Sequence, residues 1–197
     1  MTITLTPENM DAVAEQAVAT LHAGHLVIAP FDTVYGILCD PRDEAAIEHL
    51  VEVKNRPETK TLGVVVNNID QVAAITHIST ENQSQIRQMT PGRFTFILTA
   101  KSTENLSKQC LREGTIAVRI PSAELITVIA QKFGGPVAQT SANLSGHENC
   151  YDVAAVVSQL EQNLSDEDLI IDGGELEKLP PSEIWNMTGE IAFKIER

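Results

Sequence analysis

Residues 136–146 read Pro-Val-Ala-Gln-Thr-Ser-Ala-Asn-Leu-Ser-Gly, and their side chains change from apolar to small and polar along the stretch. The apolar part predicts a buried strand over 137–140, and the polar part predicts a loop that ends at Gly146. Small side chains allow the backbone N–H groups of such a loop to approach a ligand closely. Because open α/β sheets place ligands in loops at strand ends, this stretch indicates both a fold class and a candidate site.

Helices and strands alternate along the rest of the chain. Thr6-Pro7-Glu8 predicts the start of a first helix, which should stop near Gly24. Further helices are predicted over 43–53, 69–75, 80–89, 122–133 and 152–162, and strands over 26–29, 62–66, 94–98, 115–120 and 169–171, with two short strands near the C-terminus. The order has no strict βαβ rhythm, so we expect an α/β fold with a twisted, open, mixed sheet. The length suits a single domain over 1–197.

Composition narrows the class of protein. No apolar run reaches the length of a membrane span, and the N-terminus lacks a basic region followed by an apolar stretch. The three cysteines, Cys39, Cys110 and Cys150, have no metal spacing and are an odd number, which disfavours a disulfide framework. We therefore expect a cytoplasmic protein that does not enter a membrane.

Charge is distributed unevenly. The net charge of −13 argues against a nucleic-acid binder that relies on overall attraction. Residues 54–119, however, hold nine of the fourteen Lys and Arg residues and carry a net charge of +4, while the remainder carries −17. Solvated loop charge would explain this pattern, and so would a local cationic cleft for a small polyanion.

A second segment predicts where that polyanion binds. Lys54-Asn55-Arg56-Pro57 is followed by Lys60, which places three cations within seven residues. Lys and Arg beside a loop of small residues are typical of phosphate binding. Polar residues also flank predicted strands at 30–36, 91–95, 172–174 and 181–184, but each of these segments alone resembles an ordinary turn.

Several familiar sites are missing from the sequence. There is no P-loop and no Gly-x-Gly-x-x-Gly, and none of the five histidines has metal-ligand spacing, so we expect no protein-bound metal. Ser141 has no evident His and Asp partners that would activate it as a nucleophile. Catalysis by positioning and charge stabilisation of a nucleoside triphosphate fits this residue set better.

The combination of Lys54-Asn55-Arg56 with Ser141-Ala142-Asn143 resembles the Lys-x-Arg and Ser-x-Asn tetrad of the YrdC/TsaC family, the threonylcarbamoyl-AMP synthases of tRNA modification. The resemblance runs from about Leu26 to Ile191, including the Asp-Thr-Val-Tyr-Gly loop at 32–36 and the segments 115–121 and 181–184. Together these motifs are highly specific. The length is similar to that of the short bacterial form.

This resemblance implies a YrdC-like fold with a large concave cleft and a reaction that joins L-threonine, bicarbonate and ATP, carrying Mg²⁺, into threonylcarbamoyl-adenylate with release of pyrophosphate. Other proteins would then transfer the threonylcarbamoyl group to the adenosine beside the anticodon, so any contact with tRNA would be indirect. The implied catalytic residues are Lys54, Arg56, Ser141 and Asn143; those for ATP are Arg56, Lys60, Thr115 and Asn143; those for threonine are Thr33, Arg119, Ser141 and Ser182. Lys54 would complete a charged floor, and Arg119 would hold the threonine carboxylate.

Three positions depart from the family pattern. Phe31 stands where a threonine is usual, Arg93 replaces a proline, and Val65 stands where some relatives have a histidine. Two alternatives therefore remain open: a double-stranded RNA or tRNA-binding protein without synthase activity, and a paralogue that makes another carbamoyl-adenylate.

Overall fold

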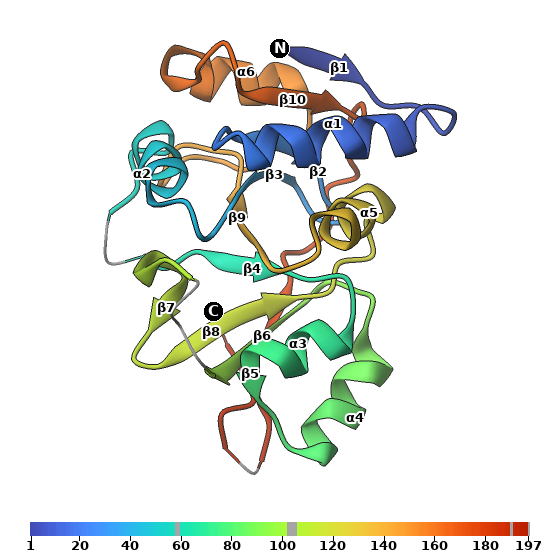
Figure 1. Cartoon of the computed structure of the whole chain (residues 1–197), viewed down its shortest axis with the longest axis vertical. Coiled ribbons are helices and arrows are strands. Elements are labelled where there is room, and N and C mark those ends of the chain that lie inside the picture. Colours follow the sequence, from blue (N-terminus) through green and yellow to red (C-terminus); the bar gives the residue numbers. More distant parts are fainter. Residues whose placement is uncertain (58–59, 102–105, 190, 197) are drawn as a thin grey trace.

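The computed structural model describes residues 1–57, 60–101, 106–189 and 191–196. Within these residues all strands belong to one mixed sheet, whose order is β1-β10-β2-β3-β9-β4-β8-β6-β11-β12, with β5 beside β6 and β7 beside β8 (Figure 1). The strands are β1 (Thr2–Thr4), β2 (Val27–Pro30), β3 (Tyr35–Cys39), β4 (Gly63–Val65), β5 (Thr76–His77), β6 (Phe94–Ala100), β7 (Leu111–Arg112), β8 (Thr115–Arg119), β9 (Val137–Ser141), β10 (Leu169–Asp172), β11 (Glu183–Asn186) and β12 (Phe193–Ile195). The predicted twisted, open, mixed sheet is confirmed.

Helices cover the sheet and connect its strands. They are α1 (Met10–His22), α2 (Glu44–Val53), α3 (Ile69–Ile75), α4 (Thr80–Met89), α5 (Glu124–Phe133) and α6 (Val153–Leu160), with short 3₁₀ turns at η1 (Lys108–Cys110) and η2 (Glu161–Asn163). Their ends follow local chemistry. The Asp43 carboxylate accepts hydrogen bonds from the backbone N–H groups of Ala45 and Ala46 and so caps α2. Helix α5 ends at Phe133 and is capped by Gly134, whose φ of +78° suits a residue without a side chain.

Two apolar clusters hold the layers together. Helices α1 and α5 lie side by side and pack their buried faces on β2 and β10 through residues such as Leu21 and Ile129. Helices α2 and α6 contribute Leu50 and Val156 to a second cluster, which continues through the sheet to α3 and α4. Burial of these aliphatic side chains is the main force that stabilises the arrangement.

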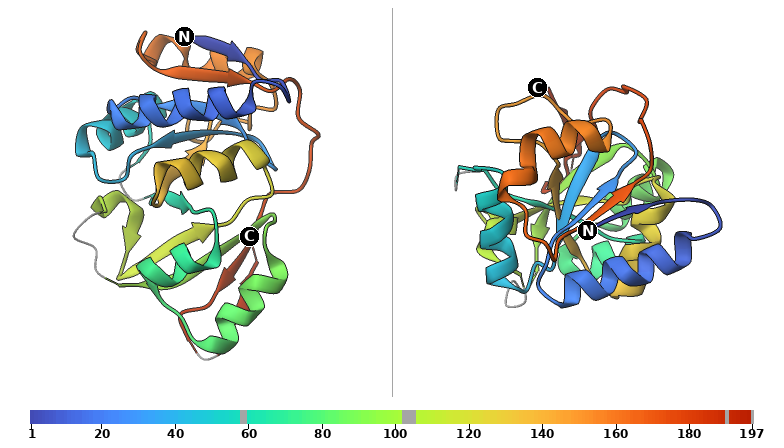
Figure 2. Two further views of the ribbon diagram at one scale, coloured as in Figure 1. Left: turned by 45° about the vertical axis from the view of Figure 1, so that its right-hand side comes forward. Right: turned by 90° about the horizontal axis from the view of Figure 1, so that it is seen from above.

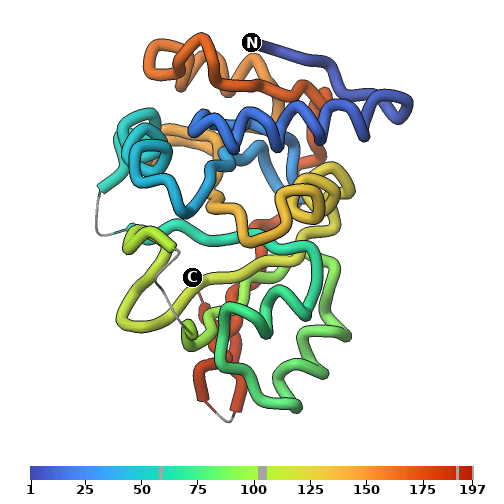
Figure 3. The backbone as a smooth tube through the Cα atoms, in the orientation of Figure 1, coloured from blue at the N-terminus to red at the C-terminus, as the bar shows by residue number. Residues whose placement is uncertain are grey.

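The middle of the sheet joins two halves of the molecule. β9 pairs with β3 on one side and with β4 on the other, and β4 then pairs with β8. The upper half in Figure 1 contains β1, β10, β2 and β3, and the lower half contains β6, β11 and β12. After β10 the chain runs back along the side of the molecule to reach β11 in the lower half (Figures 2 and 3).

Some predicted boundaries were wrong. The first helix begins at Met10 rather than at Pro7, because the Asn9 side chain accepts a hydrogen bond of 2.8 Å from the Thr6 backbone N–H and holds residues 6–9 in a turn. The segment 30–36 is not simply a loop, since the turn that follows Phe31 leads directly into β3. Strands β1, β3, β5 and β7 were not predicted from the sequence.

Candidate functional site

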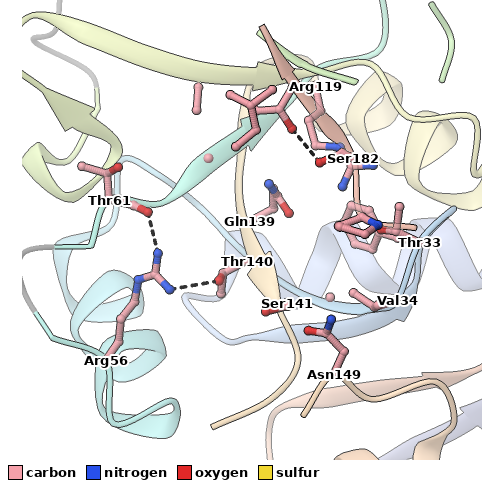
Figure 4. A pocket seen from close by; sticks show the side chains of 17 residues that line it. Thr33, Val34, Arg56, Thr61, Arg119, Gln139, Thr140, Ser141, Asn149 and Ser182 are labelled. Atoms are coloured by element: carbon pink, nitrogen blue, oxygen red, sulfur yellow. Dashed lines mark hydrogen bonds between the residues drawn. The ribbon is translucent and has the colours of Figure 1, made fainter. Parts of the chain in front are cut away.

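A cavity of about 390 Å³ lies where β9 and β4 connect the two halves of the sheet. Strands, their exits and the segment that leads into β11 all contribute to its walls (Figure 4). The lining residues are Phe31, Thr33, Val34, Gly36, Arg56, Thr61, Gly63, Thr95, Ala117, Arg119, Gln139, Thr140, Ser141, Asn149, Pro181, Ser182 and Ile184. Two of these described residues carry charge, and both are arginines. The cavity therefore favours an anionic ligand.

Arg56 occupies one side of the cavity and follows the C-terminal end of α2. Its guanidinium donates to the backbone oxygen of Lys60 at 3.0 Å, to that of Thr61 at 2.6 Å and to the hydroxyl of Thr140 at 3.3 Å. These acceptors are uncharged, and no carboxylate among the described residues pairs with Arg56. Partial burial lowers the pKa of Arg56. The group is thus a fixed cation whose charge a ligand can balance.

Lys54 does not form part of the cavity floor, which corrects the prediction. Its side chain is buried, and its ammonium donates to the backbone oxygens of Ser141 and Asn143 and, at 3.5 Å, to the Asn143 side-chain oxygen. The two distant segments do meet, as predicted. Burial, together with the positive charges of Arg56 and Lys60, lowers the pKa of Lys54 to about 7. Lys54 therefore holds the loop after β9 in place through hydrogen bonds in the protein interior.

Asn143 belongs to the same buried network. Its carboxamide accepts from the Ser141 hydroxyl and donates to the backbone oxygens of Leu144 at 3.0 Å and His147 at 2.9 Å. Ser141 lines the cavity, whereas Asn143 is not among the residues of its wall. The network fixes the position from which the Ser141 hydroxyl reaches the cavity.

The loop does not present a row of free N–H groups. Those of Ala142, Leu144, Ser145 and His147 donate within the chain, to Tyr35, the Gln159 side chain, Lys54 and Leu144 respectively. The sequence-based idea that this loop cradles an anion through its backbone is therefore wrong for these four groups. Side chains are what the loop and its strand offer to a ligand.

Arg119 lies across the cavity from Arg56, at the end of β8 (Figure 4). It donates to Asp32 at 2.6 Å, and the two side chains are each only 7% exposed. The other Asp32 oxygen accepts from the backbone N–H and the hydroxyl of Ser122, at 2.8 and 3.0 Å. This end of the cavity thus contains a buried ion pair without net charge.

Two other residues predicted to bind the substrate threonine, Thr33 and Ser182, lie at the same end of the cavity. Thr33 is buried in the cavity wall, and the hydroxyls of Ser182 and Thr95 are hydrogen-bonded at 3.0 Å. Phe31 extends over Gly36, where a methyl group would come within 2.5 Å of its ring, and the Arg119 guanidinium lies 5.8 Å from the ring centre. The Phe31 ring therefore helps to shape this end.

Two residues predicted to bind ATP, Lys60 and Thr115, are not among the residues that line the cavity. Lys60 is exposed outside its wall, although its backbone oxygen holds Arg56. Thr115 begins β8, on which Arg119 is the last residue, and its hydroxyl donates to the Arg112 backbone oxygen at 2.7 Å. Two residues of this site were not predicted from the sequence: Asp32, which pairs with Arg119, and Gln139, which lines the cavity wall. Alternate residues of a strand point to the same face of the sheet, so Gln139 could have been expected on the face of Ser141, which lies two residues later.

Comparison with known proteins identifies the family. The Sua5/YciO/YrdC family model, described as "Telomere recombination", matches residues 19–197. The chain belongs to this family. The threonylcarbamoyl-AMP synthase of Vibrio vulnificus (strain YJ016) is 33% identical over 173 residues, covering 86% of this chain and 91% of that protein. The Bos taurus protein of the same name is 36% identical over 162 residues, which cover 81% of this chain and 56% of that one.

Solved structures of the Sua5/YciO/YrdC family share the fold. Escherichia coli YciO superposes with a TM-score of 0.86 at 23% identity, over 99% of this chain and 94% of YciO. Sua5 of P. abyssi, solved with L-threonine, superposes with a TM-score of 0.86 at 24% identity, over 98% of this chain and 56% of Sua5. The likeness extends over nearly all of the chain and shows that its sheet and helices follow the family arrangement.

Two further findings concern the described part of the chain. None of its helices has the length and apolar character needed to cross a bilayer. No group of three or more His, Cys, Asp and Glu side chains in the same residues is arranged to hold a metal ion.

Proposed function

We propose that this chain is a threonylcarbamoyl-AMP synthase, which converts L-threonine, bicarbonate and ATP into threonylcarbamoyl-adenylate and pyrophosphate. The observation that carries the proposal is the difference between the two arginines of the cavity. Arg56 has only uncharged hydrogen-bond acceptors, whereas Arg119 is paired with Asp32. Curated relatives of this name align with most of the chain.

The Arg56 side suits the phosphates of ATP. Phosphoryl transfer is catalysed mainly by positioning and by balancing negative charge, and a rigid guanidinium provides both. Hydrogen bonds to Thr61 and Thr140 already orient Arg56, so little side-chain entropy remains to be lost when a nucleotide binds. Lys60 is proposed as a second, exposed cation for the phosphates, and Thr115 as a more distant contact.

The Arg119 side suits an amino acid. A zwitterion has one carboxylate, one ammonium and no net charge, as the Arg119–Asp32 pair has no net charge. The Thr33, Ser141 and Ser182 hydroxyls can hydrogen-bond the polar groups of threonine. Sua5 of P. abyssi, whose fold this chain shares, was solved with L-threonine, and this supports threonine as the amino acid in the proposal.

The proposed chemistry needs no protein nucleophile. The threonine nitrogen bonds to the carbon of bicarbonate, and loss of water leaves a carbamate. A carbamate oxygen then bonds to the α-phosphorus of ATP, while the bond from that phosphorus to the pyrophosphate oxygen breaks. Arg56 balances charge on the phosphates, and Mg²⁺ would enter with ATP as part of the substrate. Lys54 and Asn143 act as positioning residues, because their contacts hold the loop that contains Ser141.

In this proposal, other proteins use the threonylcarbamoyl-adenylate that this chain makes. Downstream transferases would take the threonylcarbamoyl group to tRNA, so no direct tRNA contact is required of this chain. The cytoplasm remains the predicted compartment.

The decisive experiment supplies the purified protein with ATP, Mg²⁺ and bicarbonate, and with each of the twenty amino acids in turn. We expect threonine to give the largest release of pyrophosphate, together with threonylcarbamoyl-adenylate detectable by mass spectrometry. A larger response to another amino acid would indicate the paralogue alternative, for which Phe31 over Gly36 gives a structural reason. No amino-acid-dependent pyrophosphate would reject synthase activity.

A further inference from the structure

Gln139 lies near the centre of β9 and contributes its side chain to the cavity wall. Figure 4 shows it between the Arg56–Thr140 pair and the group formed by Arg119 and Ser182. It therefore occupies the interval between the two ends that the proposed function assigns to phosphate and amino acid.

The neighbouring strand leaves room for this side chain. Gly63 of β4 pairs directly with Gln139, and a Cβ atom at Gly63 would lie 2.7 Å from the Gln139 side-chain nitrogen. That separation is shorter than nonbonded contacts allow. The absence of a side chain at Gly63 thus permits the Gln139 carboxamide to extend across β4 toward the middle of the cavity.

The carboxamide retains its hydrogen-bonding capacity. Within the described residues the Gln139 side chain has no hydrogen bond, although both arginines and Ser182 have protein partners. A primary amide offers two N–H donors and one carbonyl acceptor, and it adds no charge. The Gln139 carboxamide can therefore form two hydrogen bonds to a ligand that has a donor and an acceptor on adjacent atoms.

We propose that the Gln139 carboxamide binds the carbamate portion of the substrate, with its oxygen accepting from the carbamate N–H and its nitrogen donating to a carbamate oxygen. This inference rests on the proposed function, since the carbamate forms between the amino acid and the phosphate. Because the amide is neutral, it stabilises the carbamate without competing with the phosphates for Arg56. A carboxylate at the same position would repel the carbamate.

Binding measurements with two ligands test this role without relying on turnover. N-carbamoyl-L-threonine has a carbonyl group and an N–H where the carbamate would be, whereas L-threonine lacks that carbonyl. We expect Gln139→Met to weaken binding of N-carbamoyl-L-threonine about tenfold in isothermal titration calorimetry, and that of L-threonine less than about twofold. Methionine is similar in length, and Gln131→Met, at an exposed position on α5, is the matched control.

A second variant moves the amide without removing it. Gly63→Ala should displace the Gln139 side chain and reproduce the selective loss, with little change in thermal stability because the displaced group is the end of a flexible chain. Equal affinity of the wild type and Gln139→Met for N-carbamoyl-L-threonine would overturn the inference, as would failure of the wild type to bind it. Selective loss in a protein that releases no amino-acid-dependent pyrophosphate would instead support the Gln139 contact and reject the synthase proposal.

Discussion

The arginines on the two sides of the cavity differ in what balances their charge. Arg119 has Asp32 at 2.6 Å, and both side chains are almost completely buried. Arg56 has only neutral oxygen atoms as acceptors in the described structure. Removing a partner therefore has different consequences at the two positions, because a buried cation without its anion destabilises the fold, whereas loss of Arg56 removes a group meant for the ligand.

Arg56→Ala tests the phosphate assignment at the scale of one residue. We expect kcat/KM for ATP to fall roughly 10- to 100-fold, because a charge-assisted hydrogen bond to phosphate is lost. The fold should survive, as judged by circular dichroism. Arg87→Ala is the control, since Arg87 is exposed and its ion pair among the described residues is with exposed Asp70. Equal kinetic losses in the two variants would mean that the phosphate site has been misplaced.

Asp32→Asn tests the buried ion pair. Neutralising Asp32 leaves the Arg119 charge without its anion, so the free energy of unfolding should decrease by about 3–5 kcal/mol, measured by urea denaturation. The matched Asp70→Asn change affects an ion pair whose side chains are 54% and 81% exposed, and it should cost less than about 0.5 kcal/mol. A similar small loss for Asp32→Asn would contradict the structural role given to this pair.

At the scale of elements, Lys54 connects the end of α2 to the loop after β9. The pKa of Lys54 is lowered to about 7 in the folded protein, from a usual value of 10.5. Between these two pH values the unfolded chain binds more protons than the folded one. The Lys54 contribution to stability therefore increases with pH across this window, and below about pH 7 the full cost of a buried ammonium is present.

The Lys54→Met variant lacks this titration. We expect the free energy of unfolding of the wild type, relative to Lys54→Met, to rise between pH 7 and pH 9 with a slope of up to about 1.4 kcal/mol per pH unit. Urea denaturation at several pH values measures the difference. Parallel pH profiles for the two proteins would show that the Lys54 pKa is not lowered by burial.

Elements with a strong pattern were predictable from the sequence, and those fixed by distant contacts were not. Helices α2, α3 and α4 match their predicted ranges because apolar spacing and capping residues define them locally. Strand β3 was missed because its start at Tyr35 depends on pairing with β2 and β9, and the preceding polar turn resembles a loop. Two-residue strands such as β5 and β7 are too short to show any periodicity.

The candidate site was predicted in part for a similar reason. The charged residues and the small-residue loop could be found as motifs, and the structure brings Lys54 next to Ser141 and Asn143. The sequence could not show that Lys54 is buried behind the loop, or that Asp32 balances Arg119, because burial and pairing depend on the whole sheet.

At the scale of the molecule, the cavity requires both halves of the sheet. Arg56 follows α2 in the upper half, whereas Thr95 and Ile184 come from β6 and β11 in the lower half. The proposed single domain over 1–197 predicts that these halves unfold together. The one tryptophan, Trp185, lies on β11 and reports on the lower half, while far-ultraviolet circular dichroism reports on all helices.

Urea unfolding followed by both signals should therefore give the same midpoint. ATP at about one hundred times its Kd should stabilise the fold by about 2.7 kcal/mol and move both midpoints equally. Arg56→Ala at the same ATP concentration is the control, because weaker nucleotide binding should reduce the shift. Separate midpoints for the two signals would show that the halves are independent units.

The crowding between Gly63 and Gln139 also couples the evolution of these two positions. In the wild-type chain, Gly63→Ala would displace the Gln139 side chain and remove the contacts of its carboxamide. In a chain that already carries Gln139→Ser, the new methyl group would not collide with that side chain. The effects of the two substitutions should therefore not add, because Gly63→Ala displaces a carboxamide only in a chain that still carries Gln139. In a lineage that diverges from this chain, we expect alanine at position 63 to occur together with a shorter side chain at position 139.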